Sequence, residues 1–331
     1  MAKILVTGGA GYIGSVITER LLRRGETPIV LDNFTQGHRG ALPPGVEVVQ
    51  ADLAEIPALE QIFRGHDIAA VVHMAAISLV GESVRQPVRY YGENVAKMLP
   101  LVEIMLRSGC RRIVFSSTAA VYGEPAEMPI SEDCAAVPVN PYGWTKLMGE
   151  RILADTGHAA GGGDGGAFHF VSLRYFNVAG ATENSGEMHD PETHLIPRVL
   201  EVALGGRPHV EVYGTDYPTP DGTCIRDYIH VEDLAEAHLL ALDCTRIASG
   251  IYNLGNNRGY SVREVIECAA RVTRRKIPVE NHGRRGGDPP QLVASHRKAT
   301  DELGWQPHRG LEEMIASAWE WRQRHPKGYT E

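Results

Sequence analysis

The sequence lacks the features that mark membrane, secreted and nucleic-acid-binding proteins. Its longest apolar runs, such as Ala69–Val72, are far shorter than the ~20 residues that a membrane-spanning helix needs. The apolar stretch at its start is too short for a secretory signal. Positive charge is not in excess, because 33 Lys and Arg residues stand against 41 Asp and Glu residues, whereas a duplex-binding protein normally carries a basic face. We therefore expect a soluble, cytoplasmic protein with no membrane and no nucleic acid among its partners.

Cysteine is also scarce. Five cysteines are spread along the chain without the spacing of a metal finger: Cys110, Cys134, Cys224, Cys244 and Cys268. We expect them to be reduced thiols in apolar surroundings. One segment, residues 189–197, invites a metal interpretation through His189, Asp190, Glu192 and His194. Its spacing fits no helical two-histidine motif and its two prolines indicate a loop, so we expect no metal and interpret it as lining a substrate.

What the sequence does contain is the composition of an ordinary globular protein, with 43% hydrophobic residues, over a length of 331 residues that exceeds one hydrophobic core. Short apolar runs predict strands at Lys3–Thr7, Pro28–Leu31, Glu47–Gln50, Ala69–His73, Arg112–Ser116 and Phe168–Arg174. Apolar residues at three- and four-residue steps predict helices at Ile13–Arg24, Ala54–Phe63, Val88–Ser108 and Tyr142–Asp155. This alternation predicts an α/β fold with a Rossmann-like, doubly wound parallel sheet.

Beyond about Val178, turns rich in Gly, Pro and Asp separate shorter elements, which predicts a smaller mixed α/β lobe. We expect residues 1–177 to form the first domain, residues 224–248 to return to it, and residues 178–223 and 249–331 to form the second lobe. The glycine-rich residues 157–166 predict a loose surface loop. A last helix is predicted at Leu311–Arg324, with its tryptophans used for packing.

A glycine-rich turn follows the first predicted strand and opens a helix. Gly8 can turn tightly, Gly11 lets the backbone approach a pyrophosphate, and Gly14 lets helix and strand pack closely. The second strand ends at Asp32, whose carboxylate can bond the adenosine ribose and would repel a 2′-phosphate, and Arg39 is too far along to compensate. The sequence therefore predicts NAD rather than NADP. Asp52 after the third strand either brackets the adenine or caps the next helix.

Tyr142 and Lys146 stand four residues apart in a predicted helix, so both side chains face the same way. A free tyrosine has a pKa near 10, and acting as a base at pH 7 needs a shift of about three units, or ~4 kcal/mol. A lysine ammonium about 4 Å away supplies ~4 kcal/mol at an effective dielectric of ~20, and the positive nicotinamide ring of oxidised NAD adds to it. An isolated pair of this kind could also be a surface helix with a half-buried aromatic. The upstream glycine turn and the hydroxyls of Ser116–Thr118 favour catalysis.

With these motifs in place, the chain resembles the extended short-chain dehydrogenase/reductase family, in its NAD-dependent epimerase/dehydratase branch. The similarity runs nearly end to end and rests on residues 7–15, His73–Ala76, Val80–Ser83, Ser116–Gly123, Tyr142–Lys146, Leu173–Asn177 and Arg226–Asp233. It implies a first domain that holds NAD, a second lobe that holds a UDP-sugar, and a UDP-hexose 4-epimerase activity through a transient 4-keto sugar. Relatives are commonly homodimers through the helices equivalent to Val88–Ser108 and Tyr142–Asp155.

The resemblance also implies roles for individual residues. Tyr142 would take the proton from the sugar 4-hydroxyl, Thr118 would bond the same oxygen, and Lys146 would bond the nicotinamide ribose. The implied cofactor-binding residues are Gly8, Gly11, Tyr12, Ile13, Gly14, Asp32, Asn33, Asp52, Leu53, Ala75, Ala76, Asn94, Ser116, Tyr142, Lys146 and Tyr175. The implied substrate-binding residues are Thr118, Tyr142, Asn177, His194, Leu195, Tyr213, Arg226, Arg285, Asp288 and Leu292.

Arginines suit a diphosphate because a guanidinium matches phosphate geometry. Arg226 could instead form a surface ion pair with Asp227 or Asp233, and Arg284-Arg285 could be a solvated turn. Two departures from relatives stand out: Ser78 replaces a lysine that lies near the diphosphate in some of them, and Leu292 replaces a tyrosine that excludes N-acetyl sugars. We therefore expect some activity on UDP-N-acetylglucosamine.

Three other functions compete with this interpretation. The chain could prefer another UDP-sugar, such as a pentose form. It could be a sugar-nucleotide dehydratase or decarboxylase, but those enzymes need an acid after the strand-end hydroxyl, and here Ala119 and Ala120 follow Thr118. It could be a dinucleotide-sensing regulator, but such a protein would have lost Tyr142 or Lys146.

Overall fold

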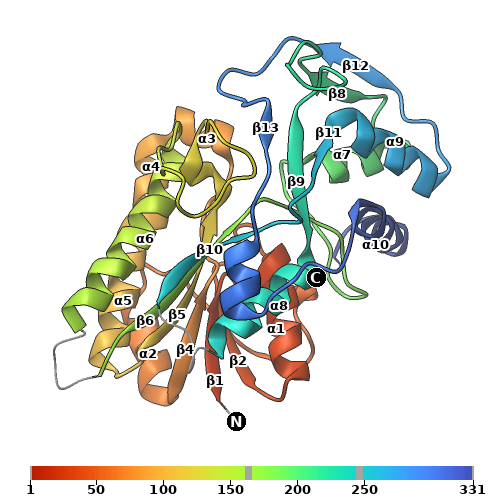
Figure 1. Ribbon diagram of the computed structural model, residues 1–331. Helices are drawn as coiled ribbons and strands as arrows, with labels where there is room; N and C mark the ends of the chain where they lie inside the picture. The colour runs from red at the N-terminus through yellow and green to blue at the C-terminus, as the bar shows by residue number, and fades with distance from the viewer. Residues whose placement is uncertain (1, 161–165, 244–248, 330–331) are drawn as a thin grey trace.

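The computed structural model describes residues 2–160, 166–243 and 249–329, and a seven-stranded parallel sheet organises the larger lobe (Figure 1). Its strands lie in the order β10-β6-β5-β4-β1-β2-β3. They are β1 (Lys3–Thr7), β2 (Thr27–Asp32), β3 (Glu47–Gln50), β4 (Ile68–His73), β5 (Arg112–Thr118), β6 (His169–Tyr175) and β10 (Gly250–Leu254). The predicted doubly wound fold is confirmed, and all six predicted strands fall within two residues of the observed bounds.

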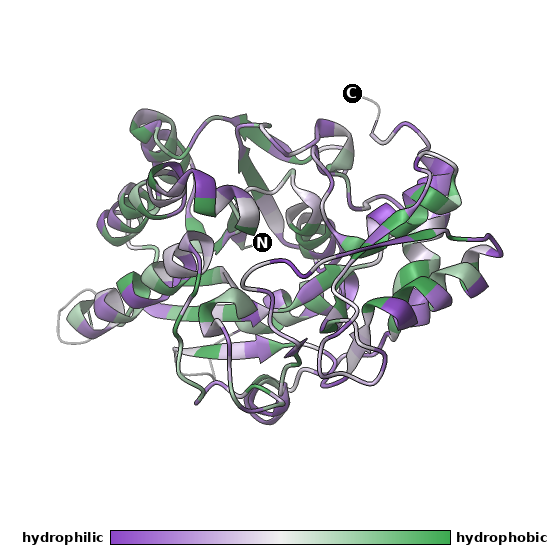
Figure 2. Ribbon diagram, turned by 90° about the horizontal axis from the view of Figure 1, so that it is seen from above, coloured by the Kyte–Doolittle hydropathy of each residue, from purple (hydrophilic) through white to green (hydrophobic). Residues whose placement is uncertain are grey.

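Helices cover both faces of this sheet. One core layer packs α1 (Tyr12–Arg23) and α8 (Val231–Leu242) against alternate strand residues such as Ile4 and Val6. The other packs α2 (Ile56–Gly65), α5 (Met98–Arg107) and α6 (Pro141–Ala160) against the opposite set, such as Leu5. The alternation follows from the two-residue period of a strand. The helices carry both hydrophobic and hydrophilic residues along their length (Figure 2), as helices that cover a sheet do.

Two predicted helices differ from those in the structure. The predicted helix Val88–Ser108 consists of α4 (Pro87–Tyr91), the π-helical turn η2 (Gly92–Ala96) and α5. The predicted helix Tyr142–Asp155 continues to Ala160, so the surface loop expected from residue 157 does not begin there, and residues 161–165 lie outside the described residues. The short helix α3 (Val80–Arg85) precedes α4, and 3-10 turns lie at η1 (Arg39–Ala41) and η3 (Ala119–Tyr122).

The smaller lobe has its own core around α7 (Leu195–Ala203), α9 (Val262–Thr273) and α10 (Leu311–Arg324). Its four-stranded sheet contains β7 (Asn177–Ala179), β9 (Ile225–His230), β11 (Gly259–Ser261) and β13 (Gln291–Leu292). A two-stranded sheet pairs β8 (Val210–Tyr213) with β12 (Val279–His282), and η4 (Ala299–Leu303) is a π-helical turn beside β10. Trp321 on α10 is buried in packing, as expected for the last helix.

The chain crosses between the lobes differently from the expected boundaries. Strand β9 lies in the small sheet, although residues 224–248 were expected to return to the first domain, whereas α8, which follows β9, packs on α1 of the first domain. Strand β10 pairs with β6 in the large sheet, although residues 249–331 were assigned to the second lobe. A local sequence pattern identifies a strand but not its partner, which is a contact between distant segments.

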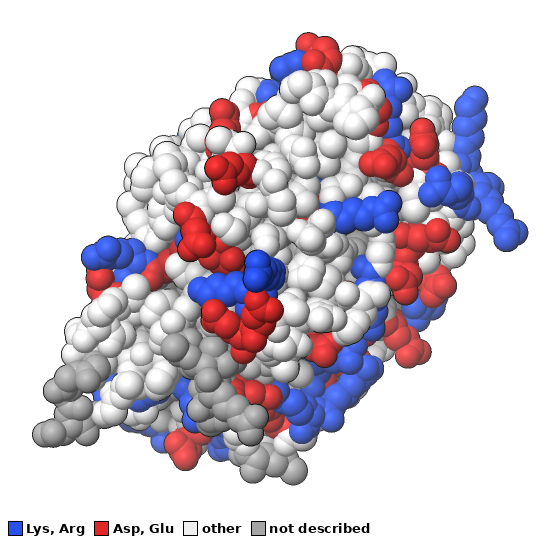
Figure 3. All heavy atoms as spheres, in the orientation of Figure 1, with Lys and Arg blue, Asp and Glu red and all other residues white. Residues whose placement is uncertain are grey.

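No helix within the described ranges is long and apolar enough to cross a membrane. Lys and Arg side chains lie interspersed with Asp and Glu on the face seen in Figure 3, so this face carries no broad basic patch of the kind that binds a duplex.

Candidate active site

The glycine turn between β1 and α1 has the close packing that its spacing predicts. Gly8 has a φ of +68°, and a Cβ on it would lie 2.6 Å from the Ala75 backbone nitrogen. A Cβ on Gly14 would lie 2.2 Å from the Gly8 carbonyl oxygen. Only glycine fits both positions, and Gly11 then starts α1 as its N-cap residue. Backbone amides at the positive end of a helix thus face the cavity described next.

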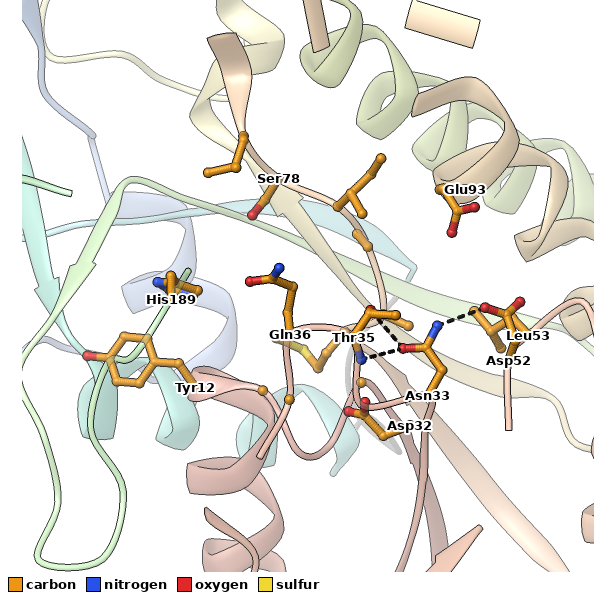
Figure 4. Close-up of a pocket in the computed structure, with 18 of the residues that line it drawn as sticks. Tyr12, Asp32, Asn33, Thr35, Gln36, Asp52, Leu53, Ser78, Glu93 and His189 are labelled. Atoms are coloured by element: carbon orange, nitrogen blue, oxygen red, sulfur yellow. Dashed lines mark hydrogen bonds between the residues drawn. The ribbon is translucent and has the colours of Figure 1, made fainter. Parts of the chain in front are cut away.

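A cavity of about 390 Å³ extends from this turn along the carboxyl ends of β1, β2 and β4. Asp32 lies in its wall and accepts hydrogen bonds from the backbone nitrogens of Ala10 (2.9 Å) and Phe34 (2.8 Å). Burial raises the pKa of the Asp32 carboxyl, and these two donors lower it. Further along the wall, Asn33 donates to Asp52 at 2.8 Å (Figure 4). This end of the cavity therefore offers carboxylate and amide groups to a polar ligand.

The side chains of Asp52 and Arg39 both have partners in this region. Helix α2 has Glu55 as its N-cap residue, so Asp52 does not cap it; its carboxylate instead pairs with Lys97 at 2.9 Å. Arg39 lies with its guanidinium 5.0 Å from the centre of the Phe34 ring, close to the turn that follows Asp32. Neither Arg39 nor Phe34 belongs to the cavity wall, so the expectation that Arg39 does not compensate for Asp32 stays a prediction.

The predicted cofactor-binding residues divide into two groups. Those in the cavity wall are Gly8, Gly11, Tyr12, Asp32, Asn33, Asp52, Leu53, Ala75 and Ala76. Those outside it are Ile13, Gly14, Asn94, Ser116, Tyr142, Lys146 and Tyr175. Asn94 lies behind the wall, because its side chain bonds the backbone nitrogen and oxygen of Ile77 (2.9 Å each) and Thr145 (3.0 Å). It holds the segment that follows β4 against α6.

The phenol, the ammonium and the hydroxyl that the sequence singled out converge at the carboxyl end of β5. Thr118 ends β5, and its hydroxyl lies close enough to the Tyr142 phenol from α6 to lower the pKa of that phenol. Lys146, one turn later on α6, donates to the Ser116 carbonyl oxygen at 2.8 Å. Tyr175 at the end of β6 hydrogen-bonds the Ser116 hydroxyl. Parallel strands end at the same edge of a sheet, so this set lies at the same edge as the glycine turn after β1, with β4 between β5 and β1.

The electrostatics of this set differ from the sequence-based argument. Burial raises the pKa of Tyr142 to about 12, and the Thr118 hydrogen bond lowers it only in part. Burial also lowers the pKa of Lys146 to about 7, with Glu150 acting to raise it. Because burial penalises both charged forms, the ammonium alone does not ionise the phenol here, and the expectation counted the positive nicotinamide ring as well. A further cation beside the phenol is needed to ionise it at neutral pH.

Sequence reasoning missed the acidic group that supports Lys146. Glu150 lies one turn beyond it on α6, is buried, and accepts from Ser117 (2.5 Å) and from Arg174 on β6 (2.8 Å to Nε). The Arg174 guanidinium also lies 4.8 Å from the centre of the Tyr122 ring. Glu150 follows Lys146 by four residues, and opposite charges at this spacing on a helix are a signal that the sequence alone provides.

The small lobe brings several predicted substrate-binding residues together. Arg226 on β9 forms an ion pair with Asp288, and Leu292 on β13 lies opposite Arg226 in the strand register. Asn177 pairs in register with Tyr228 of the same strand β9. The Arg285 guanidinium lies 3.8 Å from the centre of the Tyr213 ring.

The alternative ion pairs considered for Arg226 are wrong. The Asp227 carboxylate accepts from the backbone nitrogens of Asn256 (2.7 Å) and Ala294 (3.0 Å), and Asp233 pairs with Arg309. For the Arg284-Arg285 turn, the solvated alternative fits Arg284, which pairs with the exposed Asp216 at 2.8 Å.

His194 and Leu195 lie apart from the Arg226 group. His194 lines the cavity beside the glycine turn and pairs with Glu187 at 2.7 Å, while Leu195 packs against the core of the small lobe. Leu292 instead packs against a cluster with Ala119 and Phe176, next to the strand end that carries Thr118. The predicted substrate-binding residues thus lie in different places: His194 lies beside the glycine-turn cavity, and Leu292 lies near the end of β5.

Comparison with known proteins agrees with this geometry. The NAD-dependent epimerase/dehydratase family matches residues 4–255. The chain is 51% identical to the UDP-glucose 4-epimerase of Halalkalibacterium halodurans, covering 99% of this chain and 97% of that protein. The crystal structure of UDP-glucose 4-epimerase from Brucella ovis in complex with NAD superposes with a TM-score of 0.91 at 43% identity, covering 97% and 98% of the two chains. That from Bifidobacterium longum in complex with NAD⁺ and UDP superposes with a TM-score of 0.93 at 38% identity, covering 99% and 100%. The chain therefore belongs to the NAD-dependent epimerase/dehydratase family.

Proposed function

We propose that this protein is an NAD-dependent UDP-sugar 4-epimerase that interconverts UDP-glucose and UDP-galactose. The observation that carries the proposal is that Tyr142 and Lys146 of α6 meet Thr118 at the carboxyl end of β5, on the sheet edge that also carries the glycine turn. Similarity over nearly the whole chain to UDP-glucose 4-epimerases supports it.

The residues around the glycine turn fit NAD. The turn has no room for a Cβ at Gly8 or Gly14, which leaves backbone amides free to approach a pyrophosphate. The Asp32 carboxylate at the end of β2 suits a ribose diol. When bound, NAD accepts a hydride from the sugar C4 and returns it to the opposite face. The remaining residues proposed to hold it are those named above in the cavity wall, with Lys146 at the nicotinamide ribose.

We assign the proton transfer to Tyr142. Its phenol takes the proton of the sugar 4-hydroxyl and later returns it, and the nearby Thr118 hydroxyl bonds the same sugar oxygen. Lys146 holds positive charge near the phenol, and the buried Glu150 favours that charge. The burial of this set excludes water from the transient 4-keto sugar.

The absence of an acid next to Thr118 separates this proposal from elimination chemistry. Ala119 is buried and Ala120 follows in the η3 turn, and neither carries a group that can donate a proton to a leaving hydroxyl. A dehydratase or decarboxylase of this fold is therefore the less supported function.

We propose that the nucleotide end of the substrate lies in the small lobe. Arg226 and Arg285 face the diphosphate, Asp288, Asn177 and Tyr213 flank the nucleoside, and His194 and Leu195 lie at the far edge. Leu292 borders the sugar, and because leucine is smaller than tyrosine we expect UDP-N-acetylglucosamine to be accepted as well. In this assignment the larger lobe binds the cofactor and the smaller lobe binds the UDP-sugar. Strand β9 then belongs to the smaller lobe and strand β10 to the larger lobe.

We also propose a homodimer formed through α4, α5 and α6. Large apolar side chains are exposed on these helices, among them Val88 (83% exposed), Leu99 (49%) and Met148 (40%). Exposed apolar side chains gathered on one layer mark a protein contact. The cytoplasm is the compartment we propose, and the free thiols of the described cysteines Cys110, Cys134, Cys224 and Cys268 support it.

The direct experiment is anomeric-proton NMR of the purified protein with UDP-glucose, UDP-N-acetylglucosamine and a UDP-pentose, without added NAD. The proposal predicts UDP-galactose from UDP-glucose and a slower product from the N-acetyl sugar. A 4-keto-6-deoxy or decarboxylated product would overturn the epimerase assignment, and no turnover of the N-acetyl sugar would overturn the role of Leu292.

A further inference from the structure

Four donor groups converge between β7 and α7, and none of them takes part in the proposed proton transfer. One side-chain donor atom from each of Glu187, His189, Glu192 and His194 lies within 4.8 Å of all the others. From this convergence we infer that the four residues form a binding site for one divalent transition-metal ion of the zinc class, which fastens residues 187–194 over the cofactor cavity.

The distances between the donor atoms support this site. Two ligands at about 2.1 Å from a tetrahedral ion are separated by roughly 3.4 Å. Nδ1 of His189 lies 3.4 Å from Oε1 of Glu187 and 3.6 Å from Oε2 of Glu192, and Nδ1 of His194 lies 3.3 Å from the other Glu192 oxygen, Oε1. Only the contact between His194 and Glu187, at 2.7 Å, is as short as an ordinary hydrogen bond. Three of the four distances therefore match the separation of ligands around a shared ion.

The hydrogen-bond pattern gives independent support. Nδ1 of His189 and Oε2 of Glu192 are both shielded from solvent and have no hydrogen-bond partner. Buried polar atoms are seldom left in this state without an ion, a water or strain. In an ordinary histidine–glutamate pair the imidazolium donates to the carboxylate, whereas His189 Nδ1 lies within 3.6 Å of both carboxylates and forms a hydrogen bond with neither. Two imidazole nitrogens and two carboxylate oxygens are also ordinary zinc ligands and together balance a divalent charge.

The surroundings indicate what the ion would do. The segment is held over the turn after β2 by few contacts, such as Gln36 to the Asp190 carbonyl oxygen at 3.3 Å and His38 to the Met188 carbonyl oxygen at 3.3 Å. His189 and Tyr12 lie together at one end of the cavity (Figure 4). His194 is also the N-cap residue of α7. An ion bound here would fix both the cavity wall and the start of that helix.

The sequence predicted no metal here because two prolines exclude a helical two-histidine motif. The structure brings the donors together through a loop, so that helical spacing is not needed. The carboxylate of Glu187, which is only 8% exposed, lies outside the segment singled out from the sequence.

The test uses untagged protein, so that no affinity-tag histidines contribute, dialysed against a chelator and then titrated with Co²⁺ followed by visible absorption. Wild type is expected to bind one Co²⁺ per chain, and Zn²⁺ is expected to displace it. His189→Gln and Glu192→Gln each remove one ligand and should weaken Co²⁺ binding by at least about ten-fold. His209→Gln is the matched control, because His209 pairs with Glu280 at 2.8 Å in the small lobe, away from the cluster.

A second readout is limited proteolysis of the wild-type chain, in which Zn²⁺ should slow cleavage between residues 187 and 194 and leave His209→Gln equally protected. If wild type binds no stoichiometric Co²⁺, the site is overturned whether or not the variants fold. It is also overturned if folded His189→Gln and Glu192→Gln bind Co²⁺ as tightly as wild type. Neither outcome depends on the catalytic proposal, because neither measures turnover.

Discussion

In the proposed site, some side chains bind the nucleotide and others take part in the chemistry at the sugar. A sugar that turns over within the site needs a loose pocket, so binding energy must come from the nucleotide end. Arg226 is well placed for this, because its pair with Asp288 and its hydrogen bond to the Ile225 carbonyl oxygen (2.8 Å) fix the guanidinium beside Leu292.

We predict that Arg226→Ala raises KM for UDP-glucose far more than it lowers kcat. A hydrogen bond to a charged group contributes about 1.5–3 kcal/mol, which corresponds to roughly a 10- to 100-fold rise in KM. Steady-state kinetics would measure it, with the exposed Arg151→Ala as the control. Equal losses in both parameters would contradict the assignment of Arg226 to the nucleotide.

The second prediction at this scale concerns the ionisation of Tyr142. Burial sets the pKa of its phenol at about 12 in the protein alone, which keeps it neutral at pH 7. A positive charge beside the phenol favours the phenolate and must lower this pKa. We therefore expect the Tyr142 phenolate to appear at a lower pH with NAD bound than without it, and at a higher pH in Lys146→Met with NAD than in wild type.

Ultraviolet difference titration, with Tyr142→Phe subtracted to remove the other tyrosines, measures this pKa. If NAD leaves the pH of phenolate formation unchanged, the cofactor does not supply the cation that the buried phenol needs.

At the scale of elements, the bounds of strands were predictable and their partners were not. The β-branched run of β1 and the glycine turn after it are local signals, so the sequence locates both. That β9 leaves the large sheet while β10 joins it depends on contacts between distant segments. The pKa values of Tyr142 and Lys146 likewise depend on burial, which no spacing reveals.

The π-helical turn at Gly92–Ala96 is the element that the sequence did not predict and that most directly shapes the cavity. It places Asn94 so that its amide closes three hydrogen bonds to Ile77 and Thr145. Such turns are frequent at functional sites.

We predict that Asn94→Ala loosens the segment after β4 and reduces NAD retention while leaving the fold intact. The loss of buried hydrogen-bond partners should cost about 1–3 kcal/mol in the free energy of unfolding. Denaturant unfolding and the NAD content after gel filtration measure the two effects. Asn184→Ala, which removes a surface bond to Glu19 (2.7 Å), is the matched control. Unchanged NAD content in a destabilised Asn94→Ala would limit this residue to folding.

At the scale of the whole molecule, the two lobes leave the layer of α4, α5 and α6 on one side, away from the small lobe (Figure 1). The proposed dimer uses this layer, and its apolar side chains would be buried against a second copy. Since α6 also carries Tyr142 and Lys146, the contact would support the helix that positions the reaction.

We predict that the double variant Leu99→Glu with Met148→Glu is monomeric, because it buries charge in the proposed contact. Sedimentation equilibrium should give a dimer for wild type and for the control Val279→Glu, whose valine is 45% exposed on β12 of the small lobe. A wild-type monomer, or a double variant that still dimerises, would refute this interface.

The central claim is that the Tyr142 phenol exchanges the proton of the sugar 4-hydroxyl, and Tyr142→Phe tests it most directly. Phenylalanine keeps the ring and removes only the acid–base group. Anomeric-proton NMR with UDP-glucose should show the rate of UDP-galactose formation fall by roughly 10²- to 10⁴-fold while the NAD content stays that of wild type. Epimerisation at the wild-type rate by folded, NAD-loaded Tyr142→Phe would contradict the account.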